Sequence, residues 1–232
     1  MDKQVKSKQR VADHGEVFTA EREVKAMCDL VKQETERIDS RFLEPACGEG
    51  AFLTEILRRK LEVVTRKYKK SAYDWERYSL LALGSLYGVD IQFDNVIICR
   101  DILFDIWNKE YKSACKKDAN DETRTSAKFI LERNIVCGNA LNLLCVDENG
   151  EDLNIPIVFS EWSFPFNDAR MQRKDYTMAE LLSASEDTEK IKDEGYFNSL
   201  FSNESGEVEP TLLKQYISHY RRIFEDEGAE LR

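Results

Sequence analysis

The chain has 232 residues and is acidic, with 34 lysines and arginines against 44 aspartates and glutamates, giving a formal net charge of −10. Hydrophobic residues make up 42% and charged residues 34%, which excludes the collagen-like, wholly disordered and disulfide-stapled classes. No apolar run approaches the ~18 residues of a membrane span, and residues 1–9 lack the apolar stretch of a secretory signal. The length fits one large domain, or one domain with an extension.

Cysteine and histidine are spaced in a way that does not favour a zinc site. The six cysteines include no C-x-x-C pair, and the only histidines are His14 and His219. Most of the cysteines stand inside apolar runs, which is typical of buried, reduced thiols. The sequence therefore predicts a cytoplasmic protein without a bound metal.

Positive charge gathers in one part of this otherwise acidic chain. Residues 1–70 carry a net charge of +3, residues 71–182 carry −7 and residues 183–232 carry −6. Seven cations fall between positions 58 and 70 around a single acid, Glu62. Such a run is either the solvated face of an amphipathic helix with the loop after it, or a contact for DNA or an acidic partner.

The first predicted elements in chain order are a helix, a strand, a glycine turn and a second helix. A helix is expected from Thr19, whose hydroxyl can cap it. Residues 41–44 predict a short strand that Pro45 ends, and a turn follows at 46–50. Apolar side chains recur at helical spacing over 52–64, which predicts a strongly amphipathic helix.

The middle of the chain predicts two more strands. Residues 66–78 are polar, basic and aromatic, and predict a connection or insertion. A second strand is expected at 86–90, followed by a helix marked by apolar residues over 96–106. Residues 116–127 predict a polar linker before a third strand at 134–137.

The strand signal ends with a fourth segment. Asn149 and Gly150 indicate a turn, and the apolar run 155–159 predicts the fourth strand. Polar helices are expected after it, at 176–194 and 211–227.

Strands that alternate with helices predict an α/β fold with a parallel sheet, and such sheets bind ligands at the carboxyl ends of their strands. The predicted organisation has three parts. These are an N-terminal arm and helix at 1–40, a cofactor-binding core at 41–166 and a mostly helical extension at 167–232.

Three predicted strand ends carry residues that suggest a ligand. The turn at 44–50 lets a ligand approach the backbone, and the helix after it offers free N–H groups. Asp90 can accept hydrogen bonds from ribose hydroxyls, and Asn139 could bond to an adenine edge, although each also suits a plain turn or cap. Neither G-x-G-x-x-G nor a phosphate loop occurs, so a nucleoside without a phosphate chain, such as S-adenosylmethionine, fits better than NAD or ATP.

Four segments extend this pattern: HGEVFT at 14–19, FLEPACGEGAFL at 42–53, YGVD at 87–90 and NIVCGNAL at 134–141. In this order they resemble the adenine-specific (N-6 type) DNA methyltransferases, in particular the methylation subunits of restriction–modification systems. The resemblance covers roughly residues 11–165. It implies a Rossmann-like, S-adenosylmethionine-dependent methyltransferase fold with a mainly parallel sheet, here with fewer strands than the family has.

The resemblance also implies a role for each matching residue. Phe18 and Thr19 would line the methionine end of the cofactor, and His14 belongs to the same binding segment. Asp90 would hold the ribose, with Ile91 beside it. The residues that would wrap the methionine and sulfonium portion are Glu44, Pro45, Ala46, Cys47, Gly48 and Gly50.

Asn139, next to Ala140, would contact the adenine, where the family usually has aspartate. The amide still offers an acceptor oxygen, so this departure bears on the strength of binding more than on its existence.

The catalytic signature that the resemblance implies is degenerate in this chain. The family has an acidic, amide or hydroxyl residue, two prolines and an aromatic residue after the fourth strand, which accept from and stack on a flipped base. The segment 160–166 reads SEWSFPF, so SFPF matches with Phe164 in place of the first proline. Alternatively the preceding glutamate and tryptophan supply the acceptor and the ring, or the segment is an ordinary turn with aromatic packing. The candidate catalytic residues are Glu161, Trp162, Ser163, Pro165 and Phe166.

The function that the resemblance implies is methyl transfer from S-adenosylmethionine to the amino group of adenine in DNA, within a restriction–modification or related defence system. An acidic chain of this length has little visible means of gripping DNA alone, so it would act through or with a specificity or other partner subunit. The alternative is a catalytically inactive, methyltransferase-like binding or accessory subunit. A third possibility is methylation of a small molecule or a protein, because a cofactor site does not specify the acceptor.

Overall fold

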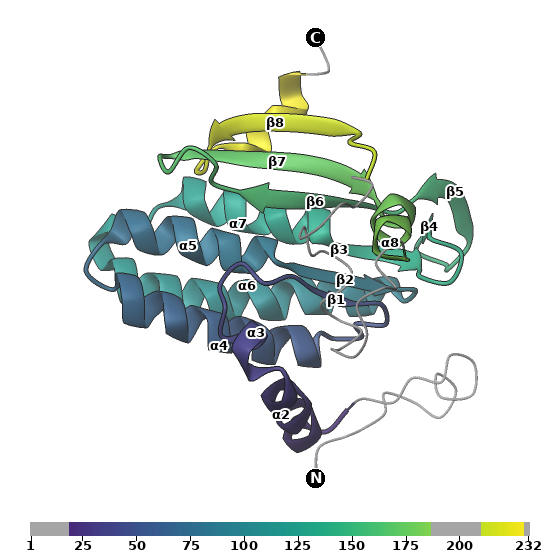
Figure 1. Cartoon of the computed structure of the whole chain (residues 1–232), viewed down its shortest axis with the longest axis horizontal. Coiled ribbons are helices and arrows are strands. Elements are labelled where there is room, and N and C mark those ends of the chain that lie inside the picture. The colour runs from purple at the N-terminus through teal and green to yellow at the C-terminus, as the bar shows by residue number, and fades with distance from the viewer. Residues whose placement is uncertain (1–18, 187–209, 230–232) are drawn as a thin grey trace.

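The computed structural model describes residues 19–186 and 210–229, so His14 and Phe18 lie outside the described residues. The described part is an α/β fold with two sheets (Figure 1). One is a mixed five-stranded sheet in the order β1-β2-β3-β4-β5, and the other has three strands in the order β6-β7-β8.

The strands are β1 Phe42–Glu44, β2 Leu86–Asp90, β3 Ile135–Asn139, β4 Leu144–Val146, β5 Asp152–Pro156, β6 Val158–Ser163, β7 Arg170–Thr177 and β8 Lys214–His219. The helices are α2 Glu21–Leu30, α3 Lys32–Thr35, α4 Ala51–Tyr68, α5 Ala72–Gly84, α6 Phe93–Cys115, α7 Asp121–Asn134 and α8 Met178–Glu186. Two 3-10 segments, η1 Lys116–Asp118 and η2 Ile223–Ala229, complete the list.

Parallel pairing of β1, β2 and β3 brings their carboxyl ends to one edge of the sheet. Glu44 pairs with Gly88, and Asp90 pairs with Cys137, so neighbouring strands end within a few residues of each other. Helices α4 and α5 connect β1 to β2, and α6 and α7 connect β2 to β3. In Figure 1 these strands run toward one side of the molecule and α4 runs back toward the other. This edge, the carboxyl-end edge, is where a ligand of a parallel sheet binds.

Several predicted elements are confirmed. The first three strands, the helices over 52–64 and 96–106 and the Asn149–Gly150 turn are all present, the turn lying between β4 and β5. Parallel pairing holds only at one end of the sheet, because β3, β4 and β5 pair antiparallel.

The two predicted connections at 66–78 and 116–127 are wrong, because both are largely helical. Helix α4 runs to Tyr68, α5 begins after Ser71, and α7 begins after Asn120. The side chains of Ser71 and Asn120 cap these helices by accepting from backbone N–H groups three residues on. One of the polar residues that suggested a loop is Glu76, whose side chain is fully buried and accepts hydrogen bonds inside the fold.

The predicted fourth strand at 155–159 is divided between the two sheets. β5 ends at Pro156, which has no N–H to donate to a ladder, and β6 begins at Val158. Between them Ile157 donates to the carbonyl of Leu143 and accepts from the N–H of Met178. The chain therefore turns out of the first sheet instead of adding a parallel strand.

The predicted mostly helical extension at 167–232 is wrong for the described residues. β7 and β8 occupy much of it, and α8 starts only at Met178. The charged residues of β7 made this segment look like a polar surface helix, but two of them point into the protein. Arg173 and Asp175 are buried and form an ion pair at 2.6 Å. Of the helices expected at 176–194 and 211–227, residues 187–194 lie outside the described part.

Thr19 is likewise not the cap of the first helix. The N-cap of α2 is Ala20, with no side-chain capping hydrogen bond.

Glu76 joins the second sheet to the helical layer. Its carboxylate accepts from the hydroxyls of Tyr111 at 2.5 Å and Tyr220 at 2.6 Å, and from Arg221 at 2.7 Å. In Figure 1 the three-stranded sheet lies along α7 and α5. The larger core cluster includes Val24 and Tyr220, so one core extends across all three predicted parts of the chain, whose division stays a prediction.

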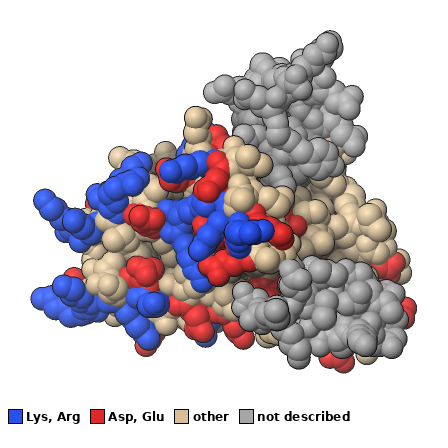
Figure 2. All heavy atoms as spheres, turned by 90° about the horizontal axis from the view of Figure 1, so that it is seen from below, with Lys and Arg blue, Asp and Glu red and all other residues tan. Residues whose placement is uncertain are grey.

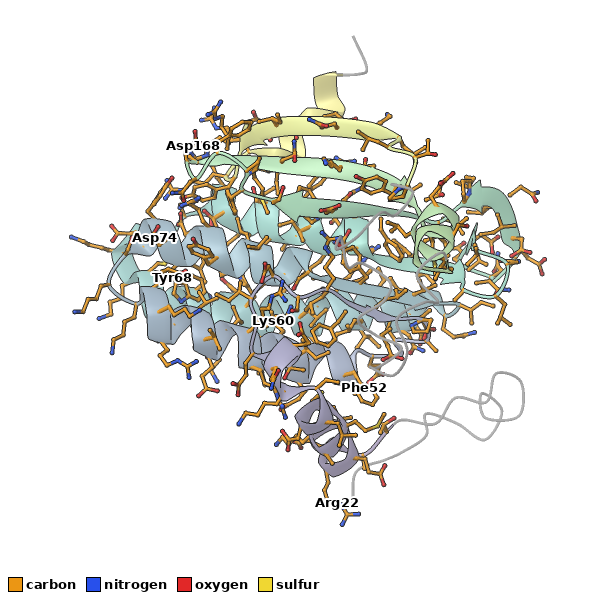
Figure 3. All side chains as sticks on the ribbon, viewed as in Figure 1. Arg22, Phe52, Lys60, Tyr68, Asp74 and Asp168 are labelled. Carbon is orange, nitrogen blue, oxygen red and sulfur yellow. The ribbon has the colours of Figure 1, made fainter. Side chains whose placement is uncertain are left out.

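Lys60 is a second buried charge, on the inner face of α4. Its ammonium donates to the hydroxyl of Ser85 at 2.5 Å and to the carbonyls of Ser40 and Ile38. Burial lowers the pKa of Lys60 to about 7. Lys60 lies inside the molecule, whereas Arg22 of α2 points away from it (Figure 3). The ammonium thus ties the chain just before β1 to the chain just before β2.

Candidate functional site

The glycine turn after β1 is wound tightly into α4. Gly48 and Gly50 have φ values of 51° and 83°, the left-handed region that glycine adopts most readily. The Cys47 N–H donates to the carbonyl of Val89 at 2.9 Å, and the Gly50 N–H donates to the carbonyl of Cys47 at 2.8 Å. The carbonyl of Gly50 then accepts from Thr54, the first hydrogen bond of α4.

Asp90 connects this turn to the end of β2. One carboxylate oxygen accepts from the Gly48 N–H at 2.8 Å. The other accepts from the Gln92 N–H at 2.8 Å and from the amide of Asn95 at 3.3 Å. Because a carboxylate offers about four acceptor positions, Asp90 retains capacity for a further donor. Its side chain is largely buried, with an exposed fraction of 9%.

Glu44 ends β1 at the same edge and has no counter-ion there. Among the described residues no hydrogen bond or ion pair involves its carboxylate, although the side chain is half-buried. Burial raises the pKa of Glu44 to about 7. A desolvated carboxyl group of this kind favours an incoming cationic donor such as an ammonium group.

Close packing explains two of the glycines without any ligand. A Cβ on Gly50 would lie 2.5 Å from Cys99 Sγ, and a Cβ on Gly88 would lie 3.0 Å from Cys47 Sγ. A hydrogen bond to Cys99, together with burial, raises the pKa of the Cys47 thiol well above its usual range. Cys47 is therefore a packed, protonated thiol that holds the turn against α6.

The end of β3 supplies Asn139 and Ala140. The side-chain oxygen of Asn139 accepts from the Leu141 N–H at 3.0 Å, which is the turn role. Its amide nitrogen has no hydrogen-bond partner in the described part of the chain and stays available to an acceptor. Cys137 also links β3 to the residue after Asp90, since its thiol donates to the carbonyl of Ile91 at 3.7 Å.

The structure thus brings most of the predicted cofactor residues to one edge. The set comprises Glu44, Pro45, Ala46, Cys47, Gly48, Gly50, Asp90, Ile91, Asn139 and Ala140. Thr19 precedes α2, which packs against α4, and no hydrogen bond joins Thr19 to the turn among the described residues.

The predicted catalytic segment lies at the other edge of the sheet, because β6 runs opposite to β1–β3. Ile157, just before β6, packs on Gly138 at the carboxyl end of β3. By its end, β6 has reached the amino edge, where Trp162 packs on Gly84, just before β2. Gly84 ends α5, and the five extended residues of β2 that separate it from the carboxyl-end edge span about 15 Å. The structure does not bring Glu161–Phe166 together with the cofactor residues.

Within the described part, the predicted catalytic residues have structural partners. Glu161 forms an ion pair with Arg41 at 2.6 Å, and Trp162 is 5% exposed. Ser163 pairs with Gln172 in the sheet, and Phe166 lies under the guanidinium of Arg170 at 4.2 Å. Pro165 is exposed between them. Sheet pairing and aromatic packing account for this segment as it stands.

Nothing in the sequence indicated a cavity of about 730 Å³ that lies between strands β3–β5 and the second sheet. Arg133, Arg173, Asp175 and Tyr216 line it with several apolar residues. Its far wall is β8, which the polar pattern at 211–227 presented as helix.

Residues 19–186 and 210–229 contain no cluster of three histidine, cysteine or acidic side chains able to hold a metal ion. Over the same residues, no helix combines the length and the apolar character needed to cross a membrane.

Comparisons with protein-family models, curated protein sequences and solved structures give no match to this chain. The geometry of the carboxyl-end edge and the sequence resemblance therefore carry the functional interpretation.

Gly50→Ala tests whether the turn depends on close packing at the start of α4. Gly150→Ala is its matched control, because both glycines have φ of 83° and nothing lies within 4 Å of a Cβ at Gly150. Both variants should lose about 1 kcal/mol from the left-handed backbone, and Gly50→Ala about 1–3 kcal/mol more from overpacking. Urea unfolding measures both, and Cys99→Ala should relieve only the excess at Gly50. Equal losses would show that the Cys99 contact is unimportant.

Proposed function

We propose that this chain binds S-adenosylmethionine at its carboxyl-end edge and is a methyltransferase-type domain of the adenine-specific DNA-modifying class. The observation that carries the proposal is the convergence of the glycine turn with Asp90 through the Gly48 hydrogen bond. The resemblance of the same segments to that family supports the choice of cofactor over other nucleosides.

The residues at the edge fit the parts of the cofactor. Glu44, a half-buried carboxyl group with a raised pKa, suits the cationic amino group of the methionine portion. Asp90 has acceptor capacity for a ribose hydroxyl. The amide nitrogen of Asn139, which has no hydrogen-bond partner among the described residues, suits an acceptor on the adenine ring. When bound, S-adenosylmethionine supplies a methyl group activated for transfer by the sulfonium. The chain's own residues would bind and orient it.

The second candidate function is a binding or accessory subunit without catalysis of its own. The position of Glu161–Phe166 at the amino edge, about 15 Å from Asp90 by the strand rise of β2, favours it. With those residues engaged in packing, the groups that accept a flipped base would come from a partner subunit. Both candidates share the cofactor edge and differ in whether the isolated chain transfers a methyl group.

Calorimetry with S-adenosylhomocysteine, the demethylated product, tests the site itself. Asp90→Asn preserves size but removes the negative charge and one acceptor, so affinity should fall at least about tenfold, or about 1.4 kcal/mol. Asp101→Asn, an exposed aspartate of α6, is the matched control and should bind like the unmodified chain. Thermal melts without ligand verify that Asp90→Asn remains folded. Unchanged affinity would remove Asp90 from the site.

The raised pKa of Glu44, about 7, predicts a pH dependence of that affinity. Below pH 7 the carboxyl group is protonated and cannot pair with the ligand's ammonium group, which stays charged up to about pH 7.7. Affinity should therefore rise between pH 6 and 7.5, by up to about tenfold per pH unit below 7, and then level off. Glu44→Gln should bind weakly with a flat profile, whereas Glu49→Gln keeps the slope. An equal slope in Glu44→Gln would assign the titration to another group.

Transfer of a tritiated methyl group to mixed genomic DNA separates the two candidate functions. The isolated chain should show little incorporation, and addition of neighbouring gene products should restore it, because the acceptor groups lie outside the cofactor edge. Robust incorporation by the chain alone, abolished in Glu161→Gln, would rule out the accessory-subunit reading. Absence of incorporation with every partner, despite cofactor binding, would favour it.

A further inference from the structure

We propose that the groove between α4 and α6 binds the phosphate backbone of nucleic acid, at a surface separate from the carboxyl-end edge. The groove has a volume of about 600 Å³. Arg58, Arg66 and Lys69 line it along α4, and Lys109 lines it from α6. All four side chains are exposed.

The charge in this groove is opposite to that of the protein. Its four cations face only two acids, Glu62 and Glu110, in a chain of net charge −10. Among the described residues, Arg66, Lys69 and Lys109 form no ion pair, whereas Arg59 of the same helix pairs with Glu55 and Asp29. Arg58 is within electrostatic range of Glu21.

Further cations continue the surface beyond the groove. Lys67, Lys70 and Lys112 are exposed beside it. Figure 2 shows Lys and Arg side chains at the end of this face away from the grey segments and across its centre, with Asp and Glu side chains between them. The groove is thus part of a larger positive surface.

The groove lies far from the candidate cofactor site. Helix α4 has 18 residues, which is about 27 Å of helix at 1.5 Å per residue. Gly50 stands at its start and Lys69 follows its last residue, so the groove occupies the half that points away from the carboxyl-end edge. A ligand here cannot be the one that Asp90 holds.

The floor of the groove favours the phosphate backbone of a nucleic acid over a protein. Protein partners anchor through exposed aromatic or aliphatic side chains. The apolar floor residues are Leu61, which is 2% exposed, and Ile106, which is half-buried. Within the part of the chain that the structure describes, no large exposed hydrophobic side chain therefore lines the groove. Arg58 and Arg66 are about 12 Å apart along the helix, which corresponds to about three base-pair steps of 3.4 Å along a duplex axis.

Fluorescence anisotropy with a labelled 20-base-pair duplex of arbitrary sequence tests this surface. The groove variant is Arg66→Glu/Lys69→Glu/Lys109→Glu. The matched control, with the same change in net charge, is Lys128→Glu/Arg170→Glu/Lys214→Glu, three exposed cations of α7, β7 and β8. The groove variant should bind at least about tenfold more weakly than the control. Its slope of log affinity against log salt should fall by about 2 to 3, since each phosphate contact contributes about 0.9.

Three results would overturn the proposal. One is equal weakening of the two variants, which would show an effect of net charge alone. Another is no binding of the duplex by the unmodified chain at 50 mM salt. The third is displacement of the duplex by poly-glutamate more effectively than by unlabelled DNA at equal charge, which would assign the groove to an acidic protein.

Calorimetry with S-adenosylhomocysteine on the groove variant keeps the two proposals separate. The cofactor edge lies at the other end of α4, so this variant should bind the ligand like the unmodified chain. DNA binding through the groove without any cofactor binding would leave this inference intact and remove the proposed function.

Discussion

The hydrogen bond from the Gly48 N–H to Asp90 fixes the geometry on which the candidate site depends. It joins residues 42 positions apart and holds the glycine turn over the end of β2. It needs the parallel pairing that aligns β1 with β2, and the left-handed backbone of Gly48 that aims its N–H at the carboxylate. Because α4 begins at the same turn, the position of that helix follows from this contact as well. The edge is therefore preorganised before any ligand arrives.

The direction of β6 is a second constraint. It places the predicted cofactor residues and the predicted catalytic residues at opposite edges of the sheet. Pro156 ends β5 without offering a ladder N–H, and the chain leaves the first sheet at Ile157. β6 then runs away from the carboxyl-end edge, so its last residues meet Arg41 and Gly84, which precede β1 and β2. The residues proposed to hold the cofactor lie together at one edge, whereas the segment expected to contact the target base lies at the other. Under the proposed function, this separation would make activity depend on a partner.

Local sequence was sufficient for the first three strands and the glycine turn after β1, because apolar runs and glycine turns depend on near neighbours. It failed where buried charges are satisfied by distant partners. Glu76 made α5 resemble a loop, yet its partner Tyr220 lies 144 residues away. The inward pair Arg173 and Asp175 masked β7 in the same way. The motif indicated Glu44, but only the folded arrangement reveals that no counter-ion lies beside it among residues 19–186 and 210–229.

Helix α4 relates the two proposed surfaces, since it begins at the glycine turn and ends beside the groove. Part of its charge has a local explanation, because cations in a last turn stabilise a helix by about 0.3–1 kcal/mol through its dipole. Arg66 and Lys69 stand there. Arg58 lies near the middle of α4, and Lys109 lies six residues before the end of α6, where the dipole is of little effect. Cations that line both walls of one groove, beyond what either helix requires, are better explained by an anion that lies between them.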